Sequence, residues 1–555
     1  MFFREKKVTG RSYLQIVENR WAGGRSRQRV VATLGRLDEL EASGKLPALL
    51  ASGARFSEAV LVLNAHKRGE GVKAEGIRTG PTLVFERLWE ETGCGPVLRS
   101  LLRQRGFTFS VERAVFLTVL HRLVDPGSDR AADKWRAAYR IRGTEEIELH
   151  HLYRAMAWLG ERLPKVDQRG RTPFAPRCTK DEVEEDLFAR RRDLFTSLDL
   201  VFFDTTSIYF EGNGGQTIGR RGKSKDHRPD LRQMVVGLVL DQQGRPVCCE
   251  LWPGNTTDVK TLVPIVDRLR KRFGVGRVCV VADRGMISEE TIATIERRDW
   301  AYILGARMRS WTEVRDQVLS RAGRYHQVTP PRQTKKDPSP LEVKEVWVGD
   351  HRYVVCFNEE QARKDAADRA AIVEGLAKTL KKGGKALVGN KGFRRFLAVP
   401  GPGFQIDPAK VRAEARYDGK WVLRTNTDWA TAEVALRYKQ LWTVEDLFRQ
   451  SKSLLDTRPI WHKRDETIRG HVFCSFLALT LRQELQSRLD ARGRADVEWG
   501  DVIHDLDRLQ ETEIEHQGKR FIVRSETVGV AGVVCQAAGV ALPPTVRRAE
   551  EVLAP

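Results

Sequence analysis

The sequence has no apolar segment long enough to cross a membrane and no apolar leader at its start. Its longest run without a charged residue, 527–546, contains a glutamine, several glycines and two prolines, whereas a spanning helix needs about 20 mostly apolar residues. The first ten residues, MFFREKKVTG, have no apolar stretch behind their charges, so we expect no signal peptide. We therefore expect a cytoplasmic protein without a membrane partner.

Cysteine is also scarce, and its spacing fits neither a disulfide framework nor a zinc site. No two cysteines form a CxxC pair among the eight, which are Cys94, Cys178, Cys248, Cys249, Cys279, Cys356, Cys474 and Cys535. Such thiols are typical of buried, reduced cysteines in a cytosolic protein.

Acidic residues are outnumbered. The 74 Asp and Glu against 95 Lys and Arg leave a formal net charge of +21, which favours a polyanionic partner. No basic amphipathic helix with an aromatic or leucine face is evident, so nucleic acid is preferred over an anionic membrane surface. A role of the charge in solubility alone is the remaining alternative. With 41% apolar residues in 555, the chain can build cores for two to four domains.

One stretch of the chain predicts a strand that is buried on both faces and has an acidic residue in its middle. Residues 201–210, VFFDTTSIYF, are almost all β-branched or aromatic and include no Gly or Pro, which is typical of such a strand. Asp204 lies at its centre, and a lone buried charge is costly. A structural Asp that is neutralised by an Arg or by backbone amides is the alternative to a functional one.

A second acid follows a neighbouring strand. Residues 234–240 and 247–252 predict an antiparallel pair, and a helix with a buried face at 262–269 leads into the strand 278–282. A helix between two strands predicts a parallel crossover. Asp283 then falls at the carboxyl end of its strand, where open α/β sheets keep their chemistry.

A third acid lies on a predicted long helix, 429–455. At about 100° per residue, Tyr438, Glu445 and Lys452 drift by only ~20° per heptad, so they follow one margin of its apolar arc, with Arg449 beside them. An ordinary surface helix also has charges at this margin. A second apolar helix, 471–489, is expected to pack beneath it.

Two segments are strongly basic. The loop 220–232 contains Arg220, Arg221, Lys223, Lys225, His227 and Arg228. The run 375–396 has seven Lys or Arg and no acid, among them Lys381, Lys382 and Lys385. We expect both to border the cleft that contains Asp204, since a phosphate backbone held there needs cations.

Asp204, Asp283 and Glu445 together form a set of hard oxygen ligands. Acids that converge repel one another at neutral pH unless a cation lies between them, and Mg²⁺ suits a few carboxylates with water and phosphate oxygens. Two ions about 3.5–4 Å apart support displacement at phosphorus. The sequence therefore predicts metal-dependent phosphoryl transfer.

At this point the motifs resemble a known family. FFDTTS, VVADRG and YKQLWTVEDLFRQSK look like the DDE transposases of bacterial insertion sequences, in the branch of the insertion-sequence-four type with a β-rich insertion and a Tyr-x₂-Arg-x₃-Glu-x₆-Lys signature. YLQIVE, RQRVVATLGRL, HRLVDPGS and GKSKDHRPDL resemble one sub-branch. The resemblance therefore covers nearly the whole chain.

The resemblance implies a DNA strand transferase. Asp204, Asp283 and Glu445 would be the catalytic, metal-binding residues, with two Mg²⁺ ions per site that Mn²⁺ can replace. Double-stranded DNA, as terminal inverted repeats and target, would be the substrate. A homodimer on DNA and association with the bacterial nucleoid are implied as well.

It also implies a fold, namely an α/β chain with an RNase H-like core. We expect a small β-hairpin region at 1–40, a mainly helical DNA-binding domain at 41–194, the two parts of the core at 195–306 and 429–490, and a C-terminal region at 491–555. A β-rich insertion domain, 307–428, is expected to interrupt the core, with hairpins at 341–357 and at 416–424 and a helix at 361–380.

The signature departs from the family at one position. Tyr438, Glu445 and Lys452 match, but Leu441 stands where the resemblance implies an Arg in contact with DNA phosphate. Arg449 or Arg437 could take over that contact. We expect Tyr438 to contact DNA, Arg449 to contact a phosphate rather than to orient Glu445, and Lys452 to be free to meet a phosphate beside the scissile one.

Two other functions keep the same fold. The chain could be a DNA endonuclease that does not join strands, or a transposase-derived DNA-binding protein that has lost catalysis. The presence of all three carboxylates and Lys452 argues against the second.

Overall fold

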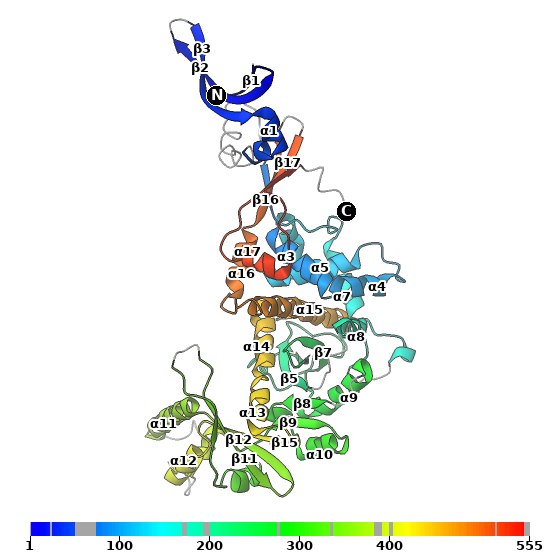
Figure 1. Ribbon diagram of the computed structural model, residues 1–555. Helices are drawn as coiled ribbons and strands as arrows, with labels where there is room; N and C mark the ends of the chain where they lie inside the picture. The colour runs from blue at the N-terminus through cyan, green and yellow to red at the C-terminus, as the bar shows by residue number, and fades with distance from the viewer. Residues whose placement is uncertain are drawn as a thin grey trace. The chain divides into compact units, whose positions relative to one another are not determined.

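The computed structural model describes residues 2–22, 25–49, 74–168, 175–191, 200–274, 278–333, 337–381, 391–398, 403–516 and 519–548 (Figure 1). The chain forms two units. The first unit comprises Met1–Gly76, Glu511–Glu526 and Pro543–Pro555, and the second comprises Ile77–Gln510 and Thr527–Leu542. Among the described helices, none has the length and apolar character needed to span a bilayer.

The first unit is built from antiparallel strands. β2 (Arg11–Ala22) pairs with β3 (Arg25–Arg36), which confirms the predicted hairpin, and β1 (Phe2–Val8) adds a third strand on the other side of β2. The short helix α1 (Leu37–Ala42) follows. A four-stranded sheet has the order β18 (Val546–Arg548), β17 (Lys519–Arg524), β16 (Gln510–His516), β4 (Ala74–Arg78).

The second unit begins with the helical region that the three- and four-residue spacing predicts. Its elements are α3 (Gly80–Glu91), α4 (Cys94–Leu102), α5 (Val111–Val124), α6 (Asp129–Trp135), η1 (Arg136–Ala138), α7 (Leu149–Leu159), η2 (Lys165–Asp167) and α8 (Thr179–Arg191). Ser110 and Ser128 cap α5 and α6 through their side chains, as N-cap serines do.

The predicted second apolar helix is α15 (Asp465–Asp490), and it is buried over most of its length. Its apolar side chains share one core with α5, α7 and the sheet, and Figure 1 shows it between these helices and the strands. α16 (Trp499–Asp507) and α17 (Ala531–Ala538) complete the helical part. A helix that is apolar on all sides needs partners on all sides.

The other layer is a nine-stranded mixed sheet of order β10-β11-β12-β15-β9-β8-β5-β6-β7. Its central strands are β5 (Leu200–Tyr209), β6 (Gln233–Leu240), β7 (Pro246–Pro253), β8 (Cys279–Ala282) and β9 (Ala301–Gly305). β5, β8 and β9 are parallel, and β6 and β7 are antiparallel to their neighbours. This confirms a mixed α/β protein and the predicted crossover between β7 and β8.

The elements around these strands are η3 (Asp258–Lys260), α9 (Leu262–Phe273), η4 (Arg284–Met286) and α10 (Glu289–Arg297). Val201 and Phe203 of β5 share a core with α9 and α10, whereas Phe202 belongs to the core of α14 and α15. Because side chains alternate along a strand, Asp204 faces the same side as Phe202.

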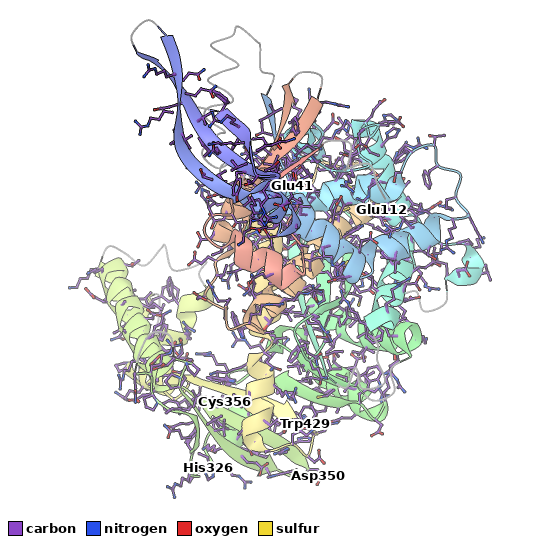
Figure 2. The ribbon with its side chains drawn as sticks, turned by 45° about the horizontal axis from the view of Figure 1, so that its top comes forward. Glu41, Glu112, His326, Asp350, Cys356 and Trp429 are labelled. Atoms are coloured by element: carbon purple, nitrogen blue, oxygen red, sulfur yellow. The ribbon has the colours of Figure 1, made fainter. Side chains whose placement is uncertain are left out.

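Segment 307–428 extends the large sheet, and two of its short strands form a separate two-stranded sheet. Its strands are β10 (His326–Thr329), β11 (Leu341–Val348), β12 (His351–Phe357) and β15 (Lys420–Thr425), and β15 pairs with β9. Figure 2 shows His326 and Asp350 at the outer end of this extension. The remaining elements are η5 (Glu313–Val318), α11 (Glu359–Lys381), η7 (Lys391–Phe396), β13 (Leu397–Ala398), β14 (Gln405–Ile406) and α12 (Pro408–Ala415).

The hairpin at 341–357 and the helix at 361–380 are confirmed by β11, β12 and α11. The hairpin at 416–424 is wrong. The residues before its turn belong to α12, which begins after the side-chain cap of Asp407, and only the residues after the turn form a strand. β15 finds its partners in β12 and β9 instead.

The prediction of a single helix over 429–455 is also wrong. The segment is divided into α13 (Thr431–Lys439), α14 (Trp442–Arg449) and the π-helical turn η8 (Gln450–Leu454), with a break at Gln440 and Leu441. No Gly or Pro signals this break in the sequence. Gln440 and Leu441 keep right-handed helical backbone angles, and Leu441 is 4% exposed and packs into the core of the second unit.

Candidate active site

Two acids meet at the centre of the sheet because of strand register. β5 and β8 are parallel, and Phe203 lies opposite Ala282. The next residues along the two strands are Asp204 and Asp283, and neighbouring strands lie about 4.8 Å apart. β8 ends at Ala282, so Asp283 is at a carboxyl end, as the sequence predicts.

The third acid reaches the same place from a helix. Glu445 lies in the first turn of α14, on the side of the sheet that Asp204 faces. A cavity of about 430 Å³ is lined by Asp204, Thr205, Thr206, Lys225, Asp283, Glu445, Phe448, Arg449, Lys452 and Arg458. The structure therefore brings together the three carboxylates that sequence reasoning selected.

The groups around this cavity shift the pKa of Asp204 in opposite directions. Burial raises the pKa of Asp204 to about 7, and the nearby carboxylates of Asp283 and Glu445 raise it as well. Lys225 and the backbone N–H of Thr205, which donates to Asp204 Oδ1 at 2.7 Å, act in the opposite direction. Burial is thus the main reason that the pKa of Asp204 is high, and the two other carboxylates add to the effect.

Asp283 is held by Tyr438. The Tyr438 hydroxyl donates to Asp283 Oδ1 at 3.1 Å, and burial together with the Asp283 carboxylate keeps the pKa of this phenol well above its usual value. Gly305, at the end of β9, makes room for the ring, because a Cβ there would lie 2.5 Å from the hydroxyl. Tyr438 therefore acts on a carboxylate, whereas the sequence predicts a DNA contact for it.

A fourth acid, Asp258, lies next to the site and was not selected from the sequence. Thr205 donates its hydroxyl to Asp258 Oδ1 at 2.7 Å, and Lys225 Nζ lies 3.3 Å from Asp258 Oδ2. Lys225 also donates to the Thr205 carbonyl at 2.6 Å. Asp258 lies in the segment that leads into α9, and nothing in its local sequence indicates a contact with β5.

Lys452 is engaged, contrary to the expectation that it is free. Its Nζ lies 2.7 Å from Asp226 Oδ1, and Arg458 Nη1 lies 2.5 Å from the same oxygen. Asp226 is an acidic residue within the basic loop 220–232, and its local sequence does not indicate a contact with Lys452 or Arg458. Neither Asp226 nor Arg458 was selected from the sequence.

Arg449 lines the cavity with a side chain that is 71% exposed, and its Nη1 lies 3.3 Å from Asp446 Oδ1. Arg437 pairs with Glu433 and covers the ring of Trp429. Leu441 belongs to the apolar core. The position that would hold the family's Arg is thus buried and does not line the cavity.

The basic loop contributes one lining residue among its predicted contacts, Lys225. Arg228 pairs with Asp230 at 2.9 Å and covers the ring of Tyr209. The others, Arg220, Arg221, Lys223 and His227, are exposed and do not line the cavity.

The run 375–396 is described in part. Lys381 ends α11 and does not line the cavity of Asp204, while Lys382 and Lys385 lie outside the described residues. Arg395, near the end of the run, lines a separate cavity of about 510 Å³ together with Arg284, the residue after Asp283.

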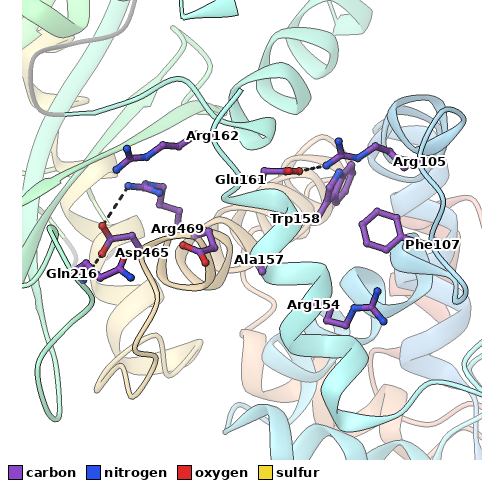
Figure 3. Close-up of a pocket in the computed structure, with 11 residues that line it drawn as sticks. Arg105, Phe107, Arg154, Ala157, Trp158, Glu161, Arg162, Gln216, Asp465 and Arg469 are labelled. Atoms are coloured by element: carbon purple, nitrogen blue, oxygen red, sulfur yellow. Dashed lines mark hydrogen bonds and ion pairs between the residues drawn. The ribbon is translucent and has the colours of Figure 1, made fainter. Parts of the chain in front are cut away.

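A further cavity, of about 520 Å³, lies among α7, α15 and the loop that contains Gln216 (Figure 3). Its lining is mixed: Arg105 pairs with Glu161, Arg469 lies 3.9 Å from Asp465, and the ring of Phe107 is edge-on to Trp158. Asp465 accepts from the backbone N–H of Gln216 at 2.8 Å. Two of its acids, Glu161 and Asp465, are engaged with neighbours, so it lacks the set of three open carboxylates of the Asp204 cavity.

In the part of the chain that the structure describes, one group of three potential ligands has all its ligand atoms within 4.8 Å, namely Asp129, His462 and His471. Arg122 Nη2 lies 2.9 Å from His471 Nδ1, and His462 Nε2 lies 3.1 Å from the same nitrogen. A cation there would displace a guanidinium from its acceptor, so a hydrogen-bond network is the better account of this cluster.

The Asp204 cavity fits divalent cations through its donor set. Its three carboxylates are more widely spaced than the ligand atoms of Asp129, His462 and His471, and all three line one cavity. Burial and the other two acids raise the pKa of Asp204. Carboxylate oxygens with room for water and phosphate are what Mg²⁺ prefers.

Comparison with known proteins supports the same chemistry. The model of the family described as "Transposase DDE domain" matches residues 196–481, and that of "IS1634 family transposase, N-terminal domain" matches residues 3–66. None of the curated proteins matches this chain. A cryo-EM structure of a piggyBac transposase synaptic complex with hairpin DNA is similar at a TM-score of 0.37 and 11% identity, over 77% of this chain and 79% of that one. Since the first model spans more than half of the sequence, the chain belongs to the DDE transposases of bacterial insertion sequences, which cleave DNA and transfer its strands.

Proposed function

We propose that this transposase cuts and joins DNA with Asp204, Asp283 and Glu445 as its catalytic carboxylates. The observation that carries the proposal is the parallel register of β5 and β8, which sets Asp204 beside Asp283 in a cavity that Glu445 also lines. We further propose that these three residues hold two Mg²⁺ ions, for which Mn²⁺ can substitute.

We also propose that the core is RNase H-like. The order β7-β6-β5-β8-β9, with a β-hairpin meander on one side and two parallel strands on the other, supports this. The core would comprise 195–306 and 429–490, interrupted by 307–428, with 1–40, 41–194 and 491–555 as the flanking regions.

When bound, the two ions would polarise the scissile phosphodiester and support the attacking and departing oxygens. The chain's own groups prepare that site. Tyr438 orients Asp283 through its hydroxyl, and the Thr205 N–H orients Asp204. Lys225 is bonded to Thr205 and Asp258, so it holds the wall of the cavity beside Asp204.

The substrate we propose is double-stranded DNA, as terminal inverted repeats and as target, bound by a homodimer. The helical domain has a candidate surface for the duplex, because exposed Arg154 and Arg162 line the cavity of Figure 3, as do Phe107 and Trp158. Arg154 also lies over the rings of Phe107 and Phe109. Cations that are held by aromatic rings keep their charge available to phosphate.

The experiment uses element-end DNA with Mg²⁺ and scores both strand cleavage and joining to a target duplex. Asp204→Asn, Asp283→Asn and Glu445→Gln should each lose both products while they still bind the ends. Asp350→Asn, at an exposed turn of the outer strands, is the matched control and should retain both.

Normal cleavage by any one of the three variants would remove that residue from the set. Cleavage by the wild-type protein without joining would favour the endonuclease. Binding without either product, in all divalent ions, would favour the catalytically silent protein.

A further inference from the structure

The catalytic cavity contains two cations that converge on a single carboxylate oxygen. Lys452 Nζ and Arg458 Nη1 lie 2.7 and 2.5 Å from Asp226 Oδ1, and both cations line the cavity of Asp204, Asp283 and Glu445. The Asp226 side chain is only 4% exposed. Two cations at this spacing, facing a cavity where DNA would be cut, form an anion-binding pair.

Asp226 is an incomplete partner for this pair. Its second oxygen, Oδ2, is buried and has no hydrogen-bond partner among the described residues, and an unsatisfied buried acceptor costs about 1–3 kcal/mol. The residue that follows, His227, has φ +57, a conformation that residues with a side chain seldom adopt. The loop thus holds the Asp226 carboxylate against the two cations, although one carboxylate oxygen stays without a hydrogen bond and His227 adopts an unfavourable backbone conformation.

The cations are positioned independently of Asp226. The Arg458 guanidinium lies over the ring of Tyr209, 5.8 Å from its centroid, and Lys452 belongs to the π-helical turn that follows α14. Tyr209 is the last residue of β5, and η8 follows α14 directly. The pair would therefore persist if the Asp226 carboxylate moved away.

We propose that Arg458 joins Lys452, for which the sequence already predicts a phosphate contact, in a subsite for a DNA phosphodiester, and that Asp226 occupies this subsite when no DNA is bound. A phosphodiester has two non-bridging oxygens that share one negative charge, and each of them can accept from one cation without leaving an acceptor buried and unpaired. The exchange is one anion for another, so no bond is made or broken. The inference deepens the proposed function, because it takes the Asp204 cavity as the place where DNA lies.

The test measures binding of a random-sequence duplex in EDTA over a range of salt concentrations, with the full-length protein. Arg458→Ala should bind about tenfold more weakly at low salt and lower the log–log salt slope by roughly 0.9, the share of one phosphate contact. Arg458→Lys should recover most of the slope. Because no cleavage is scored, failure of the carboxylate assignment leaves this result unaffected.

Asp226→Asn should bind the duplex about three- to tenfold more tightly than the wild type, since the competing charge is gone. Asp267→Asn is the matched control. It removes an equal charge from an acid–arginine pair, with Arg298, that lies on α9 and α10 outside the cavity, and it should change binding much less. In the Arg458→Ala background, the gain from Asp226→Asn should shrink, because one of the two released cations is missing.

An unchanged salt slope in Arg458→Ala would overturn the subsite. If Asp226→Asn binds no more tightly than Asp267→Asn, the proposed role of Asp226 is wrong. Its ion pairs would then serve only to stabilise the fold. If Asp226→Asn does not fold, as judged by its thermal unfolding, the Arg458→Ala and Arg458→Lys pair decides alone.

Discussion

Two donors hold the Asp283 carboxylate, the Tyr438 hydroxyl at Oδ1 and the backbone N–H of Gly285 at Oδ2. Tyr438→Phe removes its hydrogen bond to Oδ1 while keeping the ring that packs beside Gly305. Groups that orient metal ligands typically change metal affinity or activity about ten- to hundredfold when they are lost. We expect Tyr438→Phe to cleave more slowly and to need more Mg²⁺, which a titration of cleavage rate against Mg²⁺ would measure.

Duplex binding in EDTA is the readout that separates this role from a DNA contact. It should be unchanged in Tyr438→Phe, since Asp283 is not needed for binding without metal. Tyr325→Phe, next to the edge strand β10, is a control for the loss of a phenol. Weaker duplex binding with a normal Mg²⁺ requirement would instead support the phosphate contact that the sequence predicts.

His471 makes stability depend on pH. Burial and the adjacent Arg122 hold the pKa of His471 well below its usual value of 6.5. Below that value the unfolded chain takes up the proton while the folded chain resists it, so the stabilisation present above pH 6.5 is lost as the pH falls. The loss is about 1.4 kcal/mol for each pH unit until the folded pKa is reached.

Urea unfolding at pH 7.5, 6.0 and 5.0 would measure this loss. His471→Asn should be less stable at pH 7.5 but should show a flatter dependence below pH 6.5, whereas His150→Asn, whose side chain is 57% exposed, should follow the wild type. Equal slopes for His471→Asn and the wild type would mean that other groups dominate.

At the scale of elements, α8, β7 and α9 are joined by a buried network of charges. Its members are Lys180, Asp181, Glu184, Glu250, Arg268 and Arg272. Arg272 is 2% exposed and contacts Glu184 at 2.7 Å and Glu250 at 3.1 Å. Removal of one partner from such a network leaves a buried charge without compensation.

Arg272→Ala should therefore lower the free energy of unfolding by about 3–5 kcal/mol, as measured by denaturant unfolding. Arg270→Ala, two residues earlier on the exposed side of α9, should change it by less than about 0.5 kcal/mol. A small effect of Arg272→Ala would show that the neighbouring cations Lys180 and Arg268 redistribute to cover the acids.

The helical domain should bind DNA through α7 and the turn after it. Arg154→Ala with Arg162→Ala should lower the salt slope of duplex binding by roughly 0.9 for each contact that is lost. Arg87→Ala, on α3, where the side chain pairs with Glu91, is the control. If the double variant keeps the wild-type slope, this surface serves another purpose.

At the scale of the whole molecule, the net charge of +21 should be spread over several DNA contacts, one set of which lies in the first unit. Lys6, Lys7 and Arg11 are exposed on β1 and β2, in the region matched by the IS1634 N-terminal domain. Replacing all three by Ala should reduce the salt slope of end binding by roughly 0.9 per contact.

Cleavage by this triple variant at saturating DNA should equal that of the wild type, because the changes are in a different unit from the carboxylates. A gel-based binding assay and a single-turnover cleavage assay would measure the two effects. A lower cleavage rate at saturating DNA would mean that the first unit also helps to place the scissile phosphate.

The local pattern of residues was enough to find the strands β5 and β8, the crossover between β7 and β8, and Asp204 and Asp283 at their places. Burial on both faces and the position at a strand end are properties of short segments, so they are visible in the residues themselves. Glu445 and Tyr438 were found through the motif, although their helix is not continuous.

Tertiary structure alone decided the contacts between distant segments. β15 pairs with β9 rather than with its neighbours in sequence. The helix is interrupted at Leu441, which packs into the core. Lys452 and Arg458 contact Asp226, which precedes them by more than two hundred residues. Strand order, the packing of one leucine and the partner of one lysine depend on which surfaces meet in the folded chain. Periodicity within a segment carries no record of those surfaces, because the same amphipathic pattern is compatible with many partners.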